Sequence, residues 1–171
     1  ETTDALMPAE HLDGLKRCQA AIAELGIVGE IVHPGVPMPT VPLAAAAVGC
    51  HDEQIIKTVV FLDEDGRVVV GIANGTGRID RGLLADVVGV AKVSLADAET
   101  VLIRTGYAAG GVSPIGIRDA EAVIVIDPAV LTEETVYGGA GTEDDLLLLR
   151  SDVLADVTGG IVATITRSSS S

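Results

Sequence analysis

Residues 105–117 carry the composition best suited to chemistry, because four of these thirteen residues are glycine. Glycine lets main-chain amides approach a ligand closely, and Pro114 stiffens the chain and biases Ser113 toward an extended conformation. A segment of this kind can present backbone N–H and C=O groups to a substrate. Composition alone fits an ordinary glycine-rich connection equally well, so both interpretations stay open at this point.

Lys57 is the most suggestive single side chain. It lies in a β-branched stretch, residues 55–62, and strand alternation places it on the same face as Val59 and Phe61. A lysine in this position either extends to solvent at a sheet edge or points into a pocket, where it offers three donors and a positive charge. Periodicity alone favours the first interpretation.

Other candidate groups do not form a known catalytic motif. Cys50, His51 and Asp52 are adjacent in sequence, whereas catalytic triads are assembled in space. Residues 143–145 are acidic and are expected to form a solvated turn, and residues 74–77 resemble a phosphate loop only loosely. The sequence therefore predicts no side-chain nucleophile, no general base, no metal site and no cofactor, and an enzyme built on it must use backbone amides, one lysine and groups of the substrate.

Composition excludes several classes of function. The chain of 171 residues has 25 acidic and 11 basic residues, a formal net charge of −14, which is unsuited to binding duplex DNA. Its three aromatic residues are too few for a stacking surface for single strands. The longest apolar run, residues 41–50, is too short to cross a membrane. We expect a cytoplasmic protein with one domain over residues 1–167 and a disordered tail at 168–171.

The expected elements indicate an α+β fold. Helical spacing and capping residues predict helices over residues 8–25, 42–48 (capped by Thr40), 80–88 (capped by Asp80), 96–104 and after Ser151, which is expected to cap the last helix. Strands are predicted over residues 28–33, 55–62, 67–73, 91–94, 122–126, 135–137 and 161–166. Strands and helices do not alternate regularly, which favours a single domain with a mixed, mostly antiparallel sheet flanked by helices.

In this order, the motifs resemble the YbaK/EbsC family. This family is related to the editing domain inserted in bacterial prolyl-tRNA synthetases and to free-standing cysteinyl-tRNA(Pro) and alanyl-tRNA(Pro) deacylases. The resemblance rests on Gln54-Ile55-Ile56-Lys57-Thr58 and on the string Gly-Tyr-x-x-Gly-Gly-x-Ser-Pro-x-Gly over residues 106–116. Asp80, residues 96–97 and residues 136–141 support it.

The resemblance implies a curved mixed sheet and hydrolysis, in trans, of the ester that joins a wrong amino acid to a tRNA 3′ end. It implies a mischarged tRNA as substrate and prolyl-tRNA synthetase as a further partner, with a terminal ribose hydroxyl helping to activate water. Lys57 would hold the terminal adenosine or its phosphate, and Gly110 and Gly111 would form the ester site. The residues expected to border the substrate pocket are Ile31, Thr40, Ser113, Pro114 and Gly139.

The sequence departs from the family pattern in the pocket. Ile31 and Thr40 stand near positions that are aromatic in other members, and Gly139 corresponds to a serine in some of them. A downstream aspartate is replaced by Leu146, unless the register slips to Asp145. We expect a small amino acid such as alanine, serine or cysteine as the substrate, and two alternatives remain: a module that binds a tRNA end or nucleotide without hydrolysis, or a hydrolase of another small ester or amide.

Overall fold

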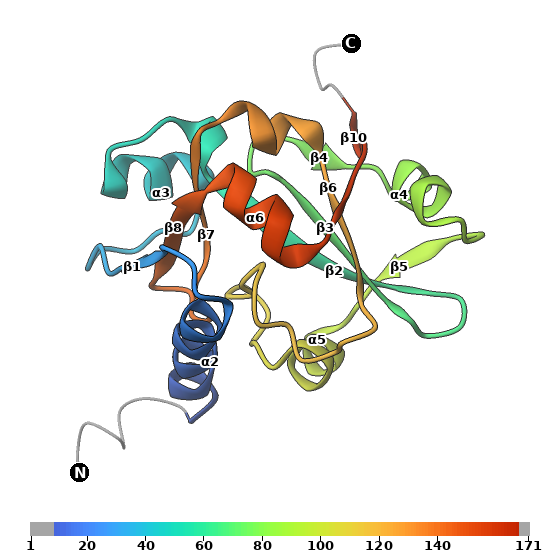
Figure 1. Cartoon of the computed structure of the whole chain (residues 1–171), viewed down its shortest axis with the longest axis horizontal. Coiled ribbons are helices and arrows are strands. Elements are labelled where there is room, and N and C mark those ends of the chain that lie inside the picture. Colours follow the sequence, from blue (N-terminus) through green and yellow to red (C-terminus); the bar gives the residue numbers. More distant parts are fainter. Residues whose placement is uncertain (1–8, 168–171) are drawn as a thin grey trace.

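The computed structural model describes residues 9–167, so the expected tail at 168–171 lies outside the described residues. A five-stranded sheet forms its centre, in the order β5 (Val93–Leu95), β2 (Ile56–Asp63), β3 (Val68–Asn74), β6 (Val123–Ile126) and β9 (Ile161–Val162) (Figure 1). The β5–β2 and β2–β3 pairs are antiparallel, whereas β3–β6 and β6–β9 are parallel. The expectation of a mixed, mostly antiparallel sheet in an α+β domain is confirmed.

Two smaller sheets complete the strand pairing. One has the order β1 (Glu30–Val32), β8 (Leu146–Arg150) and β7 (Thr135–Gly139), with both pairs antiparallel. The other is a short ribbon of β4 (Arg78–Ile79) and β10 (Thr166–Arg167). The predicted last strand over residues 161–166 is therefore two strands, β9 and β10, which belong to different sheets.

The β2–β3 hairpin forms as predicted, and its turn is stabilised locally. The Asp63 carboxylate accepts hydrogen bonds from the backbone N–H groups of Asp65 at 2.9 Å and Arg67 at 2.8 Å. Gly66 has a φ of +84°, a conformation that glycine adopts without the cost of a Cβ. The register of the hairpin pairs Lys57 with Ala73 and Val59 with Gly71.

Five helices surround the sheets within the described residues: α2 (Ala9–Leu25), α3 (Val41–Val48), α4 (Arg81–Val88), α5 (Ala98–Thr105) and α6 (Ser151–Thr158). Thr40, Asp80 and Asp97 cap α3, α4 and α5 by accepting a hydrogen bond from the third helical N–H. The predicted cap at Ser151 is wrong. Arg150 is the N-cap residue and makes no side-chain cap bond, since arginine has no acceptor. Ser151 is the first helical residue, and its hydroxyl donates to the Glu133 carbonyl at 2.5 Å.

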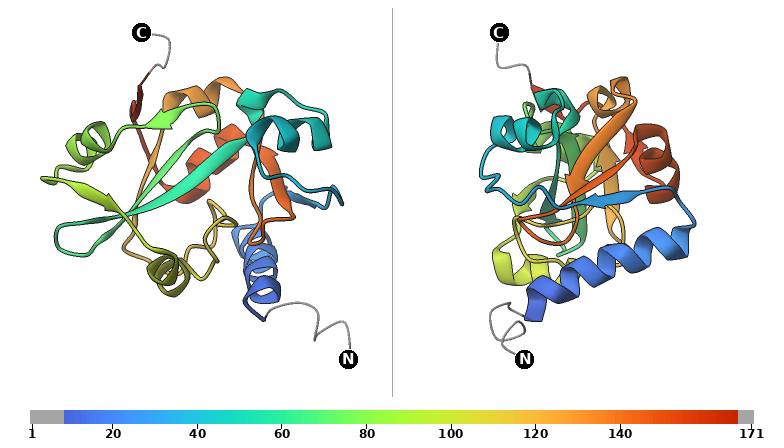
Figure 2. Two further views of the ribbon diagram at one scale, coloured as in Figure 1. Left: turned by 180° about the vertical axis from the view of Figure 1, so that it is seen from behind. Right: turned by 90° about the vertical axis from the view of Figure 1, so that its left-hand side faces the viewer.

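The central sheet is covered on both faces. Val60, Val70 and Ile126 belong to the larger core, which also includes residues of α2, α6 and the β1–β8–β7 sheet. Phe61 and Val69 belong to a second core formed with α4 and with the segment before β10. The three views place α3 and α4 at opposite ends of the molecule, and α2 at the opposite side from β10 (Figures 1 and 2). No helix among residues 9–167 is long and apolar enough to cross a membrane.

Candidate active site

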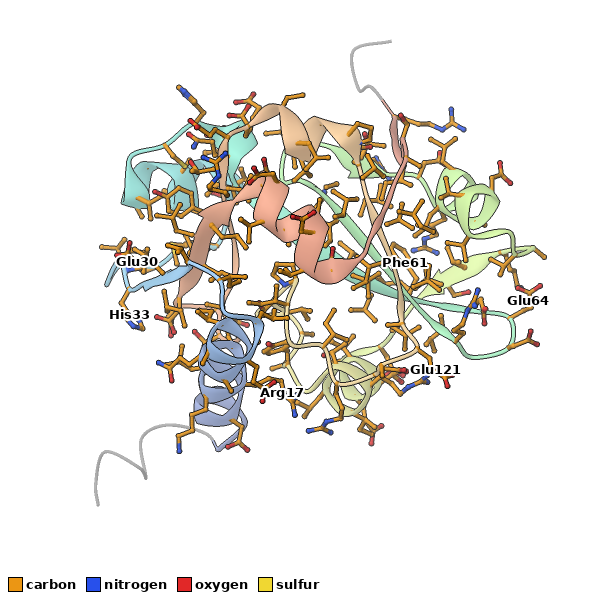
Figure 3. The ribbon with its side chains drawn as sticks, in the orientation of Figure 1. Arg17, Glu30, His33, Phe61, Glu64 and Glu121 are labelled. Carbon is orange, nitrogen blue, oxygen red and sulfur yellow. The ribbon has the colours of Figure 1, made fainter. Side chains whose placement is uncertain are left out.

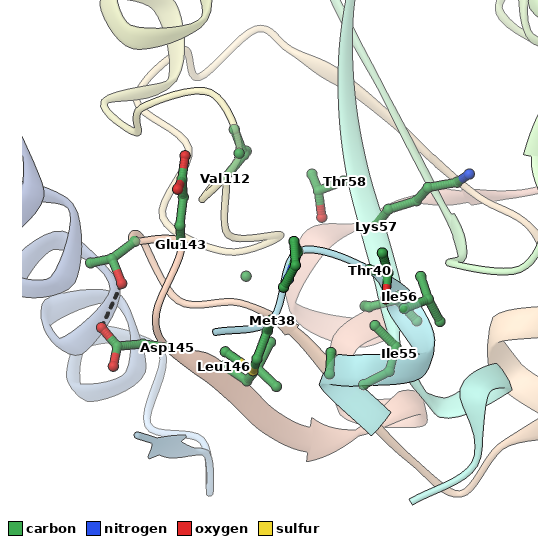
Figure 4. Close-up of a pocket in the computed structure, with 16 residues that line it drawn as sticks. Met38, Thr40, Ile55, Ile56, Lys57, Thr58, Val112, Glu143, Asp145 and Leu146 are labelled. Carbon is green, nitrogen blue, oxygen red and sulfur yellow. Dashed lines mark hydrogen bonds between the residues drawn. The ribbon is translucent and has the colours of Figure 1, made fainter. Parts of the chain in front are cut away.

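A pocket of about 340 Å³ lies where α3, the start of β2 and two glycine-containing loops meet (Figure 4). The two glycine loops are residues 106–116 and residues 138–142. It is at the base of the β2–β3 hairpin. Glu64, at the hairpin tip, lies on the opposite side of the molecule from His33, which follows β1 (Figure 3). The residues that line the pocket are Met38, Pro39, Thr40, Val41, Ala44, Ile55, Ile56, Lys57, Thr58, Gly110, Val112, Gly139, Thr142, Glu143, Asp145 and Leu146.

Four of the residues expected at the site line this pocket: Thr40, Lys57, Gly110 and Gly139. They come from four separate parts of the sequence, so the fold brings them together. Thr40 also fixes the pocket wall, because its hydroxyl accepts a hydrogen bond from the Leu43 N–H at 3.3 Å and so begins α3.

The other four expected residues do not line the pocket. Ile31 pairs with Leu147 and packs against the larger core. Ser113 is fully buried and accepts a hydrogen bond from the Ile115 N–H at 3.4 Å, and Gly111 and Pro114 are buried beside it. Gly111, Ser113 and Pro114 therefore belong to the buried part of the loop whose residues Gly110 and Val112 line the pocket.

The two glycine loops touch each other through their backbones. The Gly141 N–H donates to the Gly111 carbonyl at 2.8 Å. A Cβ at Gly111 would lie 2.8 Å from backbone atoms of Thr142, and a Cβ at Gly139 would overlap the Val112 carbonyl oxygen. Glycine is therefore required at both positions for the loops to approach this closely, and a serine at position 139 would not fit this arrangement.

Gly110 has a different role in the loop. Its φ is +92°, and a Cβ there would lie 3.1 Å from the Glu143 carboxylate. A side chain at this position would be strained and would also reach toward the pocket. The glycine keeps this part of the wall open and leaves its backbone accessible.

The sequence predicts a solvated turn at residues 143–145, but one of its three acidic side chains is buried. Asp145 is 6% exposed and lines the pocket. Its carboxylate accepts a hydrogen bond from the Thr142 hydroxyl at 2.6 Å and contacts His33 Nδ1. Strand alternation could have indicated this burial, because Asp145 shares its face with Leu147 and Leu149, which are both buried.

Lys57 and Thr58 leave β2 on opposite faces. The Lys57 side chain runs away from Glu143, whereas Thr58 lies on the pocket side (Figure 4). The Thr58 hydroxyl is buried and has no hydrogen-bond partner among the described residues. Burial, and secondarily the positive charge of Arg78, lower the pKa of Lys57.

The pocket is chemically simple. It is bordered by backbone groups, by the hydroxyls of Thr40, Thr58 and Thr142, by one lysine and by two carboxylates. Among the described residues, no group of three or more histidine, cysteine or acidic side chains is placed to hold a metal ion. Both oxygens of Asp145 are already in contact with protein groups, so this carboxylate orders the loop.

Comparison with known protein families identifies the family to which this chain belongs. The model of the aminoacyl-tRNA editing domain matches residues 36–157, which include the whole pocket. The chain belongs to this family. The resemblance inferred from Lys57 and residues 106–116 is thereby confirmed.

Relatives of this editing domain occur both inside synthetases and as separate proteins. A proline–tRNA ligase of Desulfotalea psychrophila is 31% identical over 111 residues, which are 65% of this chain and 19% of the ligase. EbsC of Enterococcus faecalis, named as a candidate Cys-tRNA(Pro)/Cys-tRNA(Cys) deacylase, is 28% identical over 71% of this chain and 74% of its own length. The chain thus spans about a fifth of the ligase.

A solved structure supports the same assignment. The crystal structure of a candidate trans-editing enzyme for prolyl-tRNA synthetase superposes with a TM-score of 0.83 and 28% identity. The superposition covers 95% of this chain and 99% of that one. The editing domain is therefore similar in extent to that free-standing protein.

Proposed function

We propose that this protein is a trans-acting aminoacyl-tRNA deacylase. It would hydrolyse the ester between a small amino acid, such as alanine, cysteine or serine, and a tRNA 3′ end, with tRNA(Pro) as the first candidate because the names of its relatives refer to tRNA(Pro) or to prolyl-tRNA synthetase. The observation that carries the proposal is the pocket wall, in which the backbones of two glycine loops meet beside Lys57. A protein with this substrate would act in the cytoplasm, where tRNAs are charged.

The proposed mechanism needs no side-chain nucleophile. A water oxygen attacks the carbonyl carbon of the ester, the bond from this carbon to the ribose oxygen breaks, and the ribose oxygen leaves with a proton. Backbone amides near Gly110 would stabilise the charge that develops on the carbonyl oxygen. Placing water and ester together supplies much of the rate, and the neighbouring ribose hydroxyl would help to activate the water.

The pocket walls favour a small amino acid. Met38, Val41 and Leu146 form an apolar surface, and the two glycine loops pack closely against each other through their backbones. Exclusion by size is effective against large side chains, whereas one methylene is worth only about 1–3 kcal/mol. We therefore expect strong rejection of large amino acids and weaker discrimination among the small ones.

The test is deacylation of a panel of mischarged tRNAs, led by Ala-, Cys- and Ser-tRNA(Pro), with wild type and with Lys57→Ala. The proposal predicts release of a small amino acid well above the spontaneous rate, and loss of this release in Lys57→Ala. If Lys57→Ala loses turnover of the tRNA ester but retains turnover of a small free ester, the substrate includes the tRNA end. Equal activity of both proteins on both substrates would favour the small-ester hydrolase.

A second experiment tests the role of the substrate hydroxyl. Alanine is esterified to the 3′ oxygen of a tRNA that ends in 2′-deoxyadenosine, and single-turnover hydrolysis is compared with the normal tRNA. We expect a rate lower by about 100-fold, the lower range for losing an acid–base group. An unchanged rate would contradict substrate assistance.

A binding module is the second candidate function. Among the described pocket-lining residues there is no aromatic side chain, and the net charge of the chain is −14, so the pocket departs from that expected for the active relatives. In this case the protein would bind a tRNA end tightly without releasing the amino acid. The panel above distinguishes the two candidates when binding is measured on the same samples.

A further inference from the structure

The helix α2 packs against both glycine loops with one of its faces. Residues 14, 17, 18 and 21 are spaced as neighbours on one side of a helix, and each of them lies against a residue of a glycine loop. The editing-domain model matches residues 36–157, so this helix lies outside the matched residues. The match therefore gives no account of why α2 contacts the loops of the pocket.

Gly14 brings the backbone of α2 against the second loop. A Cβ on Gly14 would overlap the Gly141 carbonyl oxygen, and a Cβ on Gly141 would overlap the Gly14 carbonyl. Glycine inside a helix costs roughly 1 kcal/mol relative to alanine, and here it permits two backbones to approach each other. The Gly141 N–H in turn donates to the Gly111 carbonyl at 2.8 Å, and Gly111 adjoins Gly110 in the pocket wall. A single residue, Gly141, thus lies between α2 and the part of the first loop that borders the pocket.

Arg17 contacts both ends of the first loop. Its Nη1 group donates to the Gly116 carbonyl at 3.3 Å, and a Cβ on Gly106 would overlap its Nε. The side chain extends from α2 on the side that faces this loop (Figure 3). Cys18 Sγ, from the next residue of the helix, lies 3.5 Å from the hydroxyl of Ser113 in the same loop. The helix therefore holds the first loop at several points as well as the second loop at Gly141.

We propose that α2 is part of the editing site, with Gly14 and Arg17 as positioning residues that fix the spacing of the two glycine loops. This inference rests on the proposed function and adds to it the element that holds the backbone groups near Gly110 in place. Neither positioning residue lines the pocket, so both act through the loops. Misplacing reacting groups by about 1 Å can cost about 100-fold in rate, so a small shift of α2 would lower kcat.

The first test compares Gly14→Ala with Gly82→Ala. Gly82 is the matched control because it also lies in a helix, α4, and its Cβ would meet only the Asp80 carboxylate, at 3.1 Å. We expect Gly14→Ala to lower kcat for Ala-tRNA(Pro) about 10- to 100-fold with KM unchanged. Amide hydrogen exchange should become faster in both glycine loops and stay unchanged in β3. Gly82→Ala should match wild type in all of these measurements.

A second variant tests the other contact by removing a side chain instead of adding one. Arg17→Ala should also lower kcat, and millimolar guanidinium chloride should restore part of it where sodium chloride does not. A cavity of about 590 Å³ beside Arg17 gives the small cation access. Arg118→Ala is the control, because Arg118 lines the same cavity but its side chain donates to the Ile103 carbonyl, outside the loops. This variant should keep kcat.

Three results would overturn the inference. They are equal kcat values in Gly14→Ala and Gly82→Ala, a loss in Arg17→Ala that guanidinium does not reverse, and hydrogen exchange in β3 that rises as much as exchange in the loops. Failure of the proposed function is distinguishable, because wild type would then release no amino acid. In that event hydrogen exchange decides: faster exchange of both loops in Gly14→Ala alone upholds the role of α2 in ordering them, and equal exchange in Gly14→Ala and Gly82→Ala contradicts it.

Discussion

Among the single residues, Gly111 and Gly139 are needed because they lack a Cβ, and not because glycine is flexible. Gly111 and Gly139 have no positive φ, but a Cβ on either would collide with backbone of the other loop. Backbone atoms cannot move aside as the end of a long side chain can. The loops therefore depend on glycine at these positions to approach each other this closely.

The close approach of the two loops predicts a loss of stability in Gly139→Ala. The Cβ would overlap the Val112 carbonyl oxygen, so we expect the free energy of unfolding to fall by about 1–3 kcal/mol and deacylation to fall with it. Urea denaturation measures the change. Gly29→Ala is the matched control, because its Cβ would meet only side-chain atoms at 3.5 Å or more; equal losses in the two variants would contradict the packing argument.

At the scale of elements, the sequence predicts what depends on neighbours in the chain. The hairpin of β2 and β3 and the caps at Thr40 and Asp80 follow from local residue types, and the structure confirms them. Ser151 was expected as a cap from the same local rule, but its hydroxyl bonds the distant Glu133 carbonyl. Local patterns do not contain such tertiary partners.

The site could be predicted only in part for the same reason. Lys57 and Gly110 were found because their motifs are local, whereas the pocket wall at Asp145 depends on the pairing of β8 with β1 and β7. The contact of Asp145 with His33 joins residues 112 positions apart.

The cap of α3 gives a prediction at this scale. Thr40→Ala removes the acceptor for the Leu43 N–H, and we expect a loss of about 1 kcal/mol in the free energy of unfolding. Because α3 carries Val41 and Ala44 into the pocket, deacylation should fall as well. Thr40→Ser retains the hydroxyl and should retain stability; a serine variant as unstable as the alanine variant would show that the cap is not the cause.

At the scale of the whole molecule, stability should fall at high pH. Tyr107 is fully buried and its hydroxyl donates to the Ile115 carbonyl at 2.6 Å. Burial raises the pKa of this phenol far above its usual value, and burial also raises the pKa of the Cys18 thiol. Both groups keep their protons in the folded state while the unfolded chain loses them, so stability present below about pH 9 is lost as the pH rises further.

Denaturation in urea between pH 8 and 11 measures this loss. Each group that ionises only on unfolding lowers the free energy of unfolding by up to about 1.4 kcal/mol per pH unit. Tyr107→Phe is less stable at neutral pH because the Ile115 carbonyl loses its donor, but its stability should decline less steeply above pH 10. Parallel declines in wild type and variant would contradict the assignment to Tyr107.

The central claim concerns the whole molecule acting on a tRNA end, and one measurement tests it most directly. Binding and single-turnover release of alanine from Ala-tRNA(Pro) are followed on the same samples, with protein in excess and with Lys57→Ala beside wild type. We expect binding followed by release well above the spontaneous rate in wild type alone. Tight binding by wild type with release at the spontaneous rate, for alanine and likewise for cysteine and serine, would contradict it and identify a binding module.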